Sequence, residues 1–444
     1  MISEQRYWNP MLETLPLEKL RALQLKKFKV IFRWAYENSR FHRSLYAEAG
    51  ITPSDVQKFE DICQVPKVEK SMMRCIQCKD PFPYGDCLCL PLEEVSNFRQ
   101  TSGTTGQPVY QADSWQDWEW WAESWAFILW AQGYRPCDRV FIPFGYNIFV
   151  AFWAGHYAAE KIGCEVVPGG VLDTQARILK IQELRPSAMM GTPTYMLGMA
   201  DTARNKLGIA PEGLGIKRIT CAGEPGASIP ATKRRMEEAW NAKVFDHAGA
   251  TEIGAWSYEC LDQPGGIHVN EALFLVEIED IETGQIIDEP GRRGKMVITA
   301  FDRMAMPCVR FDSKDVIEWD ERPCTCGRTF RLIKGGVVGR ADDITKVKGV
   351  LLAPSAIEEV VRGQRGLGSE YEVVVDKAGD IDRIVLKVEL SPGNESILKR
   401  IEAELQYQLR LKTNLGYVIE FHEFGTLPRY EVKARRFKDL RKHC

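Results

Sequence analysis

The stretch 101-TSGTTGQPVYQ-111 is rich in glycine and hydroxyl-bearing residues and has no apolar side chain before Val109. Such a run favours neither a helix nor a buried strand. Glycine, however, permits backbone conformations that point several N–H groups at one anion, so a phosphate-binding loop is one interpretation and a surface turn is the other. The spacing is not that of a G-x-x-x-x-G-K-[ST] loop, because Gln107 stands where a lysine would be expected.

The composition of the whole chain is that of an ordinary globular protein. The 444 residues are 45% hydrophobic and 27% charged, with a net charge of −3. This length predicts two or three cooperating units, and the charge balance argues against a nucleic-acid or anionic-membrane partner. Residues 140–159 are apolar but contain Pro, Asn, Gly and His, which favours a strand, a turn and a core helix over a membrane span. The polar N-terminus does not resemble a secretory signal, so a cytoplasmic enzyme is expected.

Hydrophobic periodicity predicts an α/β, multi-domain fold. Residues 17–48 have helical periodicity that closes at Ala-Gly 49–50, and between about 115 and 300 helices alternate with short apolar strands, which favours mainly parallel sheets flanked by helices. The expected helices are 115–130, 172–184 and 230–240, and the expected strands are 138–144, 164–169, 187–192, 216–223 and 243–249. Strands 273–280 and 295–301 suggest a smaller antiparallel element. The chain should therefore divide into a large domain, 1–338, and a small α+β domain, 339–444, with helices 355–363 and 395–411 and strands 371–378 and 382–390.

Six ordered segments resemble the adenylate-forming (AMP-binding) enzyme superfamily. They are 101-TSGTTGQP-108, 222-AGEP-225, 248-AGATE-252, 309-VRFDSKD-315, 339-GRADDITKVKGVLLAPSAIE-358 and 426-TLPRYEVKARR-436. Further segments are similar to the phenylacetate–CoA ligase subgroup, namely 81-PFPYGD-86, 144-FGYNIF-149, 258-YEC-260 and 324-CTCGRT-329. The resemblance therefore extends along the whole chain.

The resemblance implies a two-step reaction in which a carboxylic acid and ATP give an acyl adenylate and pyrophosphate, and CoA then gives the thioester and AMP. It implies that the small domain is mobile and carries the catalytic Lys433, and that Glu252 holds Mg²⁺ beside a catalytic Thr251. Attack on an anionic triphosphate needs positive charge around the phosphorus. The nucleotide-binding residues it implies are Thr101, Ser102, Gly103, Thr104, Thr105, Gly106, Gly223, Glu224, Pro225, His247, Ala248, Gly249, Asp315 and Arg340.

The resemblance also implies which residues bind the acid and CoA and which residue forms the hinge. It implies an acyl pocket at Phe144, Tyr146, Phe149 and Ala222, a hinge at Asp342 within 340–343, and CoA contacts at Lys348 and Gly349. On burial alone, the aromatic residues at 144–149 would be ordinary core side chains. Glu252 and Asp315 could likewise be capping or surface carboxylates, and Lys433 could belong to a solvated basic face.

Three positions depart from the family pattern. Gln107 replaces a common lysine, which is tolerable if Lys433 supplies the cation. Ala248 replaces an aromatic residue that stacks on adenine, so His247 or a neighbouring strand must cover the base. Gly226 follows Pro225 where the subgroup has a tryptophan, so the acid need not be phenylacetate.

Two groups of cysteines have spacing typical of metal ligands. Cys260, His268, Cys324 and Cys326 form a plausible Cys₃His set for a structural Zn²⁺, with unliganded buried cysteines as the alternative. A second group consists of Cys75, Cys78, Cys87 and Cys89. The family resemblance includes no metal site at these positions, so free thiols are favoured there.

The leading functional hypothesis is an ATP-dependent acid–CoA ligase for an aryl or arylacetic acid, and a homodimer is one expectation for its assembly. The alternative is an adenylating enzyme that uses a small branched or hydroxylated aliphatic acid, or one that transfers to a carrier-protein thiol or an amine. A third hypothesis is a nucleotide-binding module without turnover, against which the presence of Lys433, Glu252 and Asp315 together argues.

Overall fold

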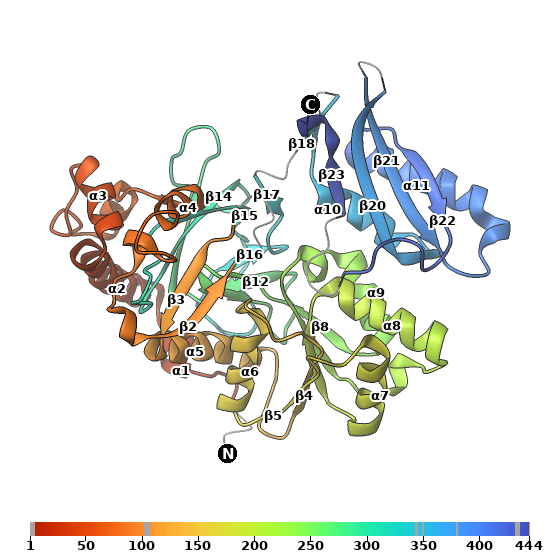
Figure 1. Ribbon diagram of the computed structural model, residues 1–444, viewed down its shortest axis with the longest axis horizontal. Helices are drawn as coiled ribbons and strands as arrows, with labels where there is room; N and C mark the ends of the chain where they lie inside the picture. Colours follow the sequence, from red (N-terminus) through yellow and green to blue (C-terminus); the bar gives the residue numbers. More distant parts are fainter. Residues whose placement is uncertain are drawn as a thin grey trace. The chain divides into compact units, whose positions relative to one another are not determined.

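The computed structural model describes residues 5–101, 107–341, 345–348, 350–378, 381–430 and 436–443. The chain forms two compact units (Figure 1): unit 1 comprises Met1–Gly170 and Phe245–Val337, and unit 2 comprises Val171–Val244 and Val338–Cys444. The second segment of unit 2 begins within one residue of the boundary predicted at 338/339. Because unit 2 also includes residues 171–244, the division into 1–338 and 339–444 stays a prediction.

Unit 1 begins with three helices, α1 (Pro10–Glu13), α2 (Leu17–Asn38) and α3 (Arg40–Glu48). The continuous helix predicted over 17–48 is wrong at Ser39, whose backbone is extended and whose side chain accepts a hydrogen bond from the His42 N–H. Serine at this position therefore starts a new helix instead of continuing the first one. The chain leaves α3 through Gly50, at a φ of +66° that favours glycine.

The apolar side of α2 packs on an antiparallel sheet in unit 1. This sheet consists of β13 (Phe274–Glu279), β14 (Arg293–Ala300) and β15 (Phe311–Glu318), with the short β1 (Val68–Glu69) parallel to β15. Phe28 and Phe32 of α2 share a buried cluster with Leu275 and Phe301. The antiparallel element predicted at 273–301 is therefore present, extended by β15.

A two-stranded hairpin precedes the tryptophan-rich helix. Strands β2 (Val95–Gln100) and β3 (Tyr110–Ser114) pair antiparallel, and α5 (Trp115–Ala131) follows β3 without a loop. Ser114 and Asp117 form a reciprocal cap at the start of α5. Most of the helix is buried, whereas Trp115 at its first position is exposed.

Parallel pairing is present in each unit. In unit 1, β4 (Arg139–Ile142) pairs parallel with β5 (Glu165–Pro168), and α6 (Ala151–Lys161) connects them. In unit 2, β6 (Ala188–Gly191) pairs parallel with β7 (Arg218–Cys221). The surrounding helices are α7 (Thr174–Leu184), α8 (Pro193–Leu207) and α9 (Pro230–Trp240). The predicted alternation of helices and parallel strands is confirmed.

The C-terminal segment of unit 2 has the predicted α+β character (Figure 1). Its four-stranded sheet has the order β22 (Val418–His422), β21 (Ile381–Leu390), β20 (Leu367–Ala378) and β23 (Phe437–Asp439). Helices α10 (Pro354–Gly363) and α11 (Leu398–Thr413) contribute Ile357 and Leu405 to its apolar core.

The remaining elements are short. They are α4 (Lys70–Gln77), β8 (Lys243–Asp246), β9 (Gly249–Ala250), β10 (Gly254–Ala255), β11 (Ser257–Tyr258), β12 (Gly266–Val269), β16 (Leu332–Lys334), β17 (Gly339–Arg340), β18 (Thr345–Val347), β19 (Val350–Leu352) and the 3₁₀ turns η2 (Phe59–Gln64), η3 (Gly85–Cys87), η4 (Leu92–Glu94), η5 (Pro211–Gly213), η6 (Pro225–Ser228), η7 (Glu395–Ile397) and η8 (Leu440–His443). In the described ranges, no helix is both long enough and apolar enough to cross a membrane.

Candidate functional site

The glycine- and threonine-rich stretch connects the two strands of the β2–β3 hairpin. Ser102, Gly103, Thr104, Thr105 and Gly106 lie outside the described residues. Thr101 is buried and closes the base of the loop: its N–H donates to the Val109 carbonyl, and its Oγ1 accepts from the Val109 N–H, both at 2.9 Å. Strand pairing up to Thr101 therefore fixes where the loop begins and ends.

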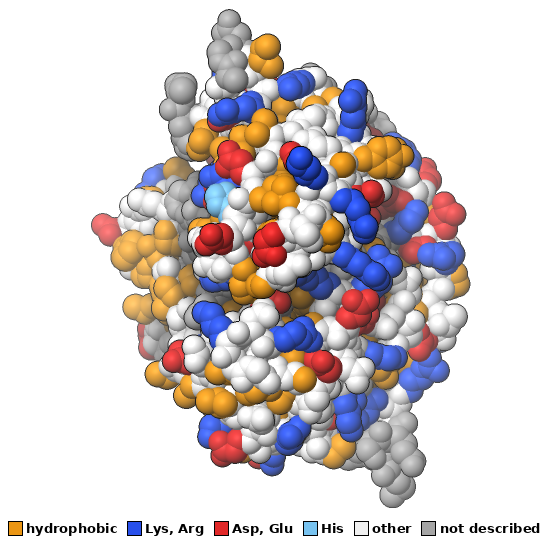
Figure 2. Space-filling model, turned by 90° about the vertical axis from the view of Figure 1, so that its right-hand side faces the viewer, with side chains coloured by type: hydrophobic (Ala, Val, Ile, Leu, Met, Phe, Trp, Pro, Cys, Tyr) orange, Lys and Arg blue, Asp and Glu red, His pale blue; other side chains and the backbone are white. Residues whose placement is uncertain are grey.

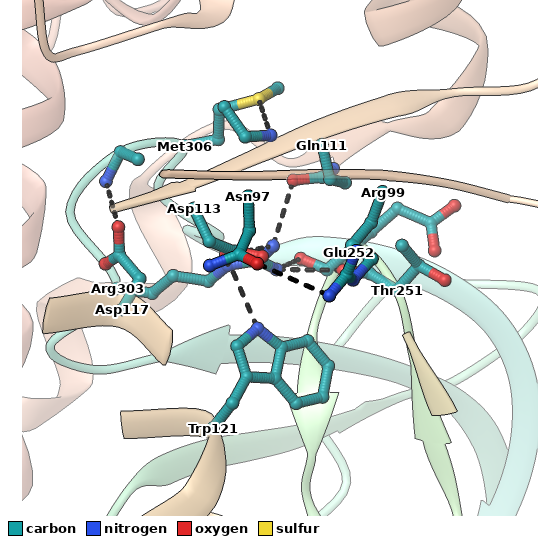
Figure 3. Close-up of polar contacts among 12 residues, drawn as sticks. Asn97, Arg99, Gln111, Asp113, Asp117, Trp121, Thr251, Glu252, Arg303 and Met306 are labelled. Atoms are coloured by element: carbon teal, nitrogen blue, oxygen red, sulfur yellow. Dashed lines mark hydrogen bonds and ion pairs between the residues drawn. The ribbon is translucent and has the colours of Figure 1, made fainter. Parts of the chain in front are cut away.

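A fully buried arginine, Arg303, joins this hairpin to the Thr-Glu segment of unit 1 (Figure 3). Its Nε and Nη2 donate to Asp113 Oδ1 at 3.1 and 2.9 Å, and Nη2 also donates to Gln111 Oε1 at 3.2 Å. Its Nη1 donates to the backbone oxygens of Thr251 and Glu252, each at 2.9 Å. One planar guanidinium thus holds β3 and residues 251–252 in a fixed relation, a geometry that the five donors of arginine permit.

Asp113 is as deeply buried as its partner, Arg303. Burial raises the pKa of its carboxyl, and the Arg303 guanidinium opposes that rise. Trp121 of α5 lies below the pair, with its Nε1 3.4 Å from Asp113 Oδ1 and the arginine over its ring. A charge pair in such surroundings is costly to break, because either partner left alone would be an uncompensated buried charge.

The segment around the predicted adenine site is held tightly. His247 is buried, its ring centroid lies 4.3 Å from that of Trp125, and its Nδ1 lies 2.6 Å from the Ser257 carbonyl oxygen. A carbonyl can only accept, so Nδ1 carries the proton, and burial lowers the pKa of His247 to about 4, which keeps the ring neutral at pH 7. Ala248 binds Ser257 Oγ through its N–H, and at Gly249 an added Cβ would lie 2.9 Å from the Gly254 oxygen.

Glu252 has a cationic partner that the sequence did not indicate. Its side chain is only 6% exposed, and its Oε1 lies 2.6 Å from the Lys70 Nζ at the start of α4. This pair places a lysine beside the carboxylate that is predicted to bind Mg²⁺. Lys70 lies in unit 1, the same unit as the hairpin in which Gln107 replaces a lysine. Gln107 itself is exposed and accepts a contact from Cys78 Sγ at 3.2 Å.

Of the other predicted nucleotide and CoA residues, Asp315 and Arg340 lie on separate strands, and Lys348 lies in the turn after β18. Asp315 lies in β15, and its N–H donates to Ser313 Oγ at 3.0 Å. In unit 2, Arg340 ends β17, and Lys348 is exposed at a φ of +47° with its N–H 3.2 Å from Asp382 Oδ2. Asp342 and Gly349 lie outside the described residues.

The segment 222–225 follows β7 in unit 2. Ala222 is buried and Gly223 has a φ of +91°, a conformation that favours glycine. Glu224 accepts a hydrogen bond from the Thr194 N–H at 2.6 Å, and Thr194 Oγ1 accepts from Arg436 Nη1 at 2.7 Å. Pro225 begins η6.

Lys433 lies outside the described residues, but both flanks of its segment are anchored. On the preceding side, Arg429 makes a two-pronged contact with the buried Glu389, at 2.8 and 2.7 Å. On the following side, the buried Arg436 donates to Glu370 at 2.7 Å. The first contact is bidentate, which makes it directional, and the second is a single buried ion pair, so the described residues on both sides of 431–435 are held to β21 and β20.

The three aromatic residues predicted for the acyl pocket differ in environment. Phe144 is 4% exposed and packs edge-on against Phe152, as a core side chain does. Tyr146 is half-buried, with its hydroxyl 2.8 Å from His156 Nδ1, and burial raises the pKa of its phenol. Phe149 is also half-buried. The structure therefore leaves Tyr146 and Phe149 more accessible than Phe144.

Gly226, where the subgroup has tryptophan, has no room for a side chain. A Cβ added there would lie 2.5 Å from the Pro193 Cβ and 2.9 Å from its Cγ. Atoms do not approach so closely, so a larger residue requires a shift of η6 or of the start of α8.

Four residues converge on a candidate metal centre in unit 1. The ligand atoms of Cys260, His268, Cys324 and Cys326 all lie within 4.8 Å of one another. The Cys260 and Cys324 sulfurs are 3.6 Å apart, and Cys326 Sγ is 3.4 Å from His268 Nε2. His268 Nδ1 lies 3.0 Å from the Phe330 carbonyl oxygen, so Nδ1 carries the proton and Nε2 turns its lone pair towards the sulfurs.

The elements around the centre fix these ligands. His268 lies on β12, which pairs with β11 on one side and β16 on the other. The Cys324–Cys326 turn is held by the Tyr7 hydroxyl, which donates to the Cys326 carbonyl at 2.8 Å, and it continues through Gly327 at a φ of +80°. Three sulfurs and one imidazole nitrogen in this spacing fit a tetrahedral metal ion.

Comparisons with known proteins identify the family of this chain. Residues 349–441 match the family described as "AMP-binding enzyme C-terminal domain". A phenylacetate–coenzyme A ligase of Thermus thermophilus is 33% identical over 456 aligned positions, which cover 98% of this chain and 100% of the relative. The chain belongs to the phenylacetate–CoA ligase family. It is an AMP-forming acid–CoA ligase, with a carboxylic acid, ATP and CoA as its substrates and an acyl adenylate as its intermediate.

Solved structures of one CoA ligase resemble this family member over nearly its whole length. 2-Hydroxyisobutyryl-CoA ligase in the postadenylation state, in complex with R3-HIB-AMP, has a TM-score of 0.93 at 28% identity, covering 99% of this chain and 93% of that one. The same ligase with 2-HIB-AMP and CoA in the thioesterification state has a TM-score of 0.75 at 29% identity, covering 98% and 93%.

Sequence reasoning missed the residues that organise the site of this ligase. Arg303 lies in 302-DRMAMP-307 and Lys70 in 68-VEKSMM-73, and neither stretch has an informative spacing. The signal that could have indicated Arg303 is a charged residue between two apolar strands, which needs a buried partner.

The second cysteine group stays unassigned to a metal. Among the residues that the structure describes, Cys75, Cys78, Cys87 and Cys89 do not gather into a set of ligands. Cys75 and Cys78 are exposed, and burial raises the pKa of the Cys87 thiol to about 12. Protonated or solvent-exposed thiols are in keeping with the prediction of free cysteines.

Proposed function

We propose that this ligase activates an aryl or arylacetic acid as its acyl adenylate and transfers the acyl group to CoA. The observation that supports this choice of acid is the similarity of this chain, across 98% of its length, to a curated phenylacetate–coenzyme A ligase. The aromatic residues at 144–149 fit the choice, because aromatic rings pack favourably against an aryl group.

A second candidate is a small branched or hydroxylated aliphatic acid. It is favoured by the TM-score of 0.93 with 2-hydroxyisobutyryl-CoA ligase and by Gly226, where the subgroup has a tryptophan. The Tyr146 hydroxyl, already hydrogen-bonded to His156, could also bind a substrate hydroxyl.

For the adenylation step, Glu252 holds Mg²⁺ beside Thr251, and the ion neutralises triphosphate charge when bound. Two observations support this placement: Glu252 is buried, and Arg303 fixes its backbone. Lys70, which pairs with the Glu252 carboxylate, supplies positive charge on the triphosphate side, where Gln107 supplies none.

The remaining roles follow the family pattern. Residues 101–106 and 223–225 bind phosphate and nucleotide together with His247, Ala248 and Gly249, and Asp315 and Arg340 bind the ribose. Lys433 stabilises the charge between carboxylate and α-phosphate. The C-terminal domain then turns about Asp342, and Lys348 and Gly349 contact CoA. The unequal TM-scores of one ligase in its two states support such a rearrangement.

At the metal centre, Zn²⁺ is bound by Cys260, His268, Cys324 and Cys326. Sulfur and imidazole ligands in a closed tetrahedral set favour zinc in a structural role. A cytoplasmic location and a homodimer stay predictions from the sequence.

The test of the proposed substrate is AMP release that depends on acid, ATP and CoA together. The acids to compare are phenylacetate, benzoate and 2-hydroxyisobutyrate, with the thioester of each identified by mass spectrometry. We expect the highest kcat/KM with an aromatic acid. A preference for 2-hydroxyisobutyrate by more than about tenfold, equivalent to about 1.4 kcal/mol of transition-state binding, would select the second candidate.

A further inference from the structure

Unit 2 contains an arginine-lined cavity that the proposed reaction does not use. Its volume is about 430 Å³, and it lies between α9 and the turn that joins α10 to β20. The charged side chains that line it are Arg234, Arg235, Arg362, Arg365 and, as the one carboxylate among its described lining residues, Glu238. We call it the arginine cavity.

One guanidinium in the arginine cavity is buried without full hydrogen bonding. Arg362 is only 4% exposed; its Nη1 donates to the Ser369 carbonyl, and its Nε is 3.6 Å from Glu358 Oε1. Its Nη2 is buried and has no hydrogen-bond partner among the described residues, and the same is true of Ser369 Oγ. An unpaired buried donor is costly, so a ligand that brought a hydrogen-bond acceptor to this guanidinium would lower that cost.

A second guanidinium lies close to the first and repels it. Arg235 donates from Nη2 to the Leu367 carbonyl at 2.8 Å. Burial and the positive charge of Arg362 lower the pKa of Arg235 to about 10, although the carboxylates of Asp201 and Glu370 oppose the shift. The carboxylates of Asp201 and Glu370 therefore compensate only part of the positive charge of Arg235 and Arg362.

Basic residues alone do not make a site. Lys and Arg side chains are numerous over the face of the molecule seen in Figure 2, interspersed with Asp and Glu. The arginine cavity differs from such a surface in two ways: it is concave, and it includes the buried and incompletely paired Arg362. Arg234 and Arg365 are exposed at its rim, where they can close on a ligand.

We propose that the arginine cavity binds a phosphate-bearing anion, which links α9 to the turn between α10 and β20. Arginine recognises phosphate through two parallel hydrogen bonds, and several guanidiniums around one cavity match a group with more than one charge. A volume of about 430 Å³ exceeds that of a single phosphate and accommodates pyrophosphate or the phosphates of a nucleotide. This inference does not rest on the proposed substrate or on the metal ions.

The test uses the full-length chain and two matched double variants. Arg234→Ala/Arg365→Ala removes two exposed arginines from the cavity, and Arg400→Ala/Arg410→Ala removes two exposed arginines from α11, so both lose the same charge. Inorganic phosphate, pyrophosphate and adenosine 3′,5′-bisphosphate are titrated by calorimetry at constant ionic strength. Amide hydrogen exchange at residues 363–367 reports binding in the cavity, as distinct from binding at the ATP site.

We expect at least one anion to protect residues 363–367 from exchange in the parent and in the α11 variant. In the cavity variant that protection should disappear and the affinity of the anion for the cavity should fall at least about tenfold. Tighter binding of the bisphosphate would identify a nucleotide ligand, and tighter binding of pyrophosphate an inorganic one. The proposal is overturned if no anion protects residues 363–367 below about 10 mM, or if both double variants behave alike.

Discussion

At the scale of single residues, the site depends on a few buried charges whose partners are far apart in the sequence. Arg303 is hydrogen-bonded to β3 on one side and to the backbone of Thr251 and Glu252 on the other. Because β3 is the second strand of the hairpin, the same guanidinium holds β3 and the backbone of Glu252 in a fixed relation (Figure 3). If Thr251 and Glu252 act at the nucleotide site, as proposed, Arg303 is a positioning residue for that site.

Replacing Arg303 by leucine should therefore be severely destabilising. The change leaves Asp113 as an unpaired buried carboxylate, and breaking a buried pair in this way costs about 3–5 kcal/mol of unfolding free energy. Urea denaturation measures this loss. The control is Arg204→Ala, which breaks an exposed pair with Glu212 and should cost less than about 1 kcal/mol.

The conservative variant Arg303→Lys separates positioning from folding. Lysine keeps the charge but cannot contact Asp113, Gln111 and two backbone oxygens at once, so the KM for ATP should rise even where the chain stays folded. Unchanged ATP kinetics in a folded Arg303→Lys variant would show that Arg303 has only a structural role.

Lys70 gives a second prediction at this scale. If Lys70 supplies charge on the triphosphate side, Lys70→Ala should lower kcat/KM for ATP in adenylation by about a hundredfold, similar to the loss of one charge-stabilising donor in other active sites. Pyrophosphate-exchange kinetics measure it, with Lys67→Ala as the control, because Lys67 pairs with Glu279 instead at 2.5 Å. If Lys70→Ala bound Mg²⁺ more tightly while the adenylation rate stayed unchanged, Lys70 would only compete with the ion for Glu252.

At the scale of elements, the candidate metal centre brings β12 together with the Cys324–Cys326 turn, which Tyr7 near the N-terminus also contacts. A bound ion contributes its binding free energy directly to folding. We expect one zinc per chain by elemental analysis after a chelator wash. Cys324→Ser should then lower the melting temperature, whereas the exposed Cys137→Ser should not. Absence of zinc from the washed protein would contradict the assignment.

Hydrophobic periodicity predicted most helices and strands, because the order of buried and exposed side chains along these elements can be read from the local sequence. The span of α9 was predicted to the residue, and strands β4 to β7 were predicted to within two residues, since apolar runs bounded by turns define them. The break at Ser39 was missed, because apolar spacing continues on both sides of it and only a cap interrupts the helix.

The candidate site was predictable only where its residues form contiguous stretches. Residues 248–252 and the cysteine set have recognisable spacing, and the structure brings the four metal ligands together. The pairs Arg303–Asp113 and Lys70–Glu252 join residues that are distant in sequence, so no local pattern identifies the partner of each charge. They arise from burial, which requires a partner for each charge.

At the scale of the whole molecule, the central claim is that one chain performs two half-reactions with different requirements. Lys433 should be needed only for the first, because negative charge develops between the carboxylate and the α-phosphate, whereas the thiol later attacks an acyl group that is already activated. The anchored flanks at Arg429 and Arg436 fit a lysine presented on a tethered segment.

The most direct measurement is of both half-reactions in Lys433→Ala. The matched control is Lys438→Ala, an exposed lysine that pairs with Glu372 at 3.0 Å. We predict that Lys433→Ala lowers adenylate formation by several orders of magnitude and leaves thioester formation from supplied acyl adenylate and CoA near the parent rate, with the control unchanged in both. Equal loss of the two half-reactions in a folded Lys433→Ala variant would contradict the account.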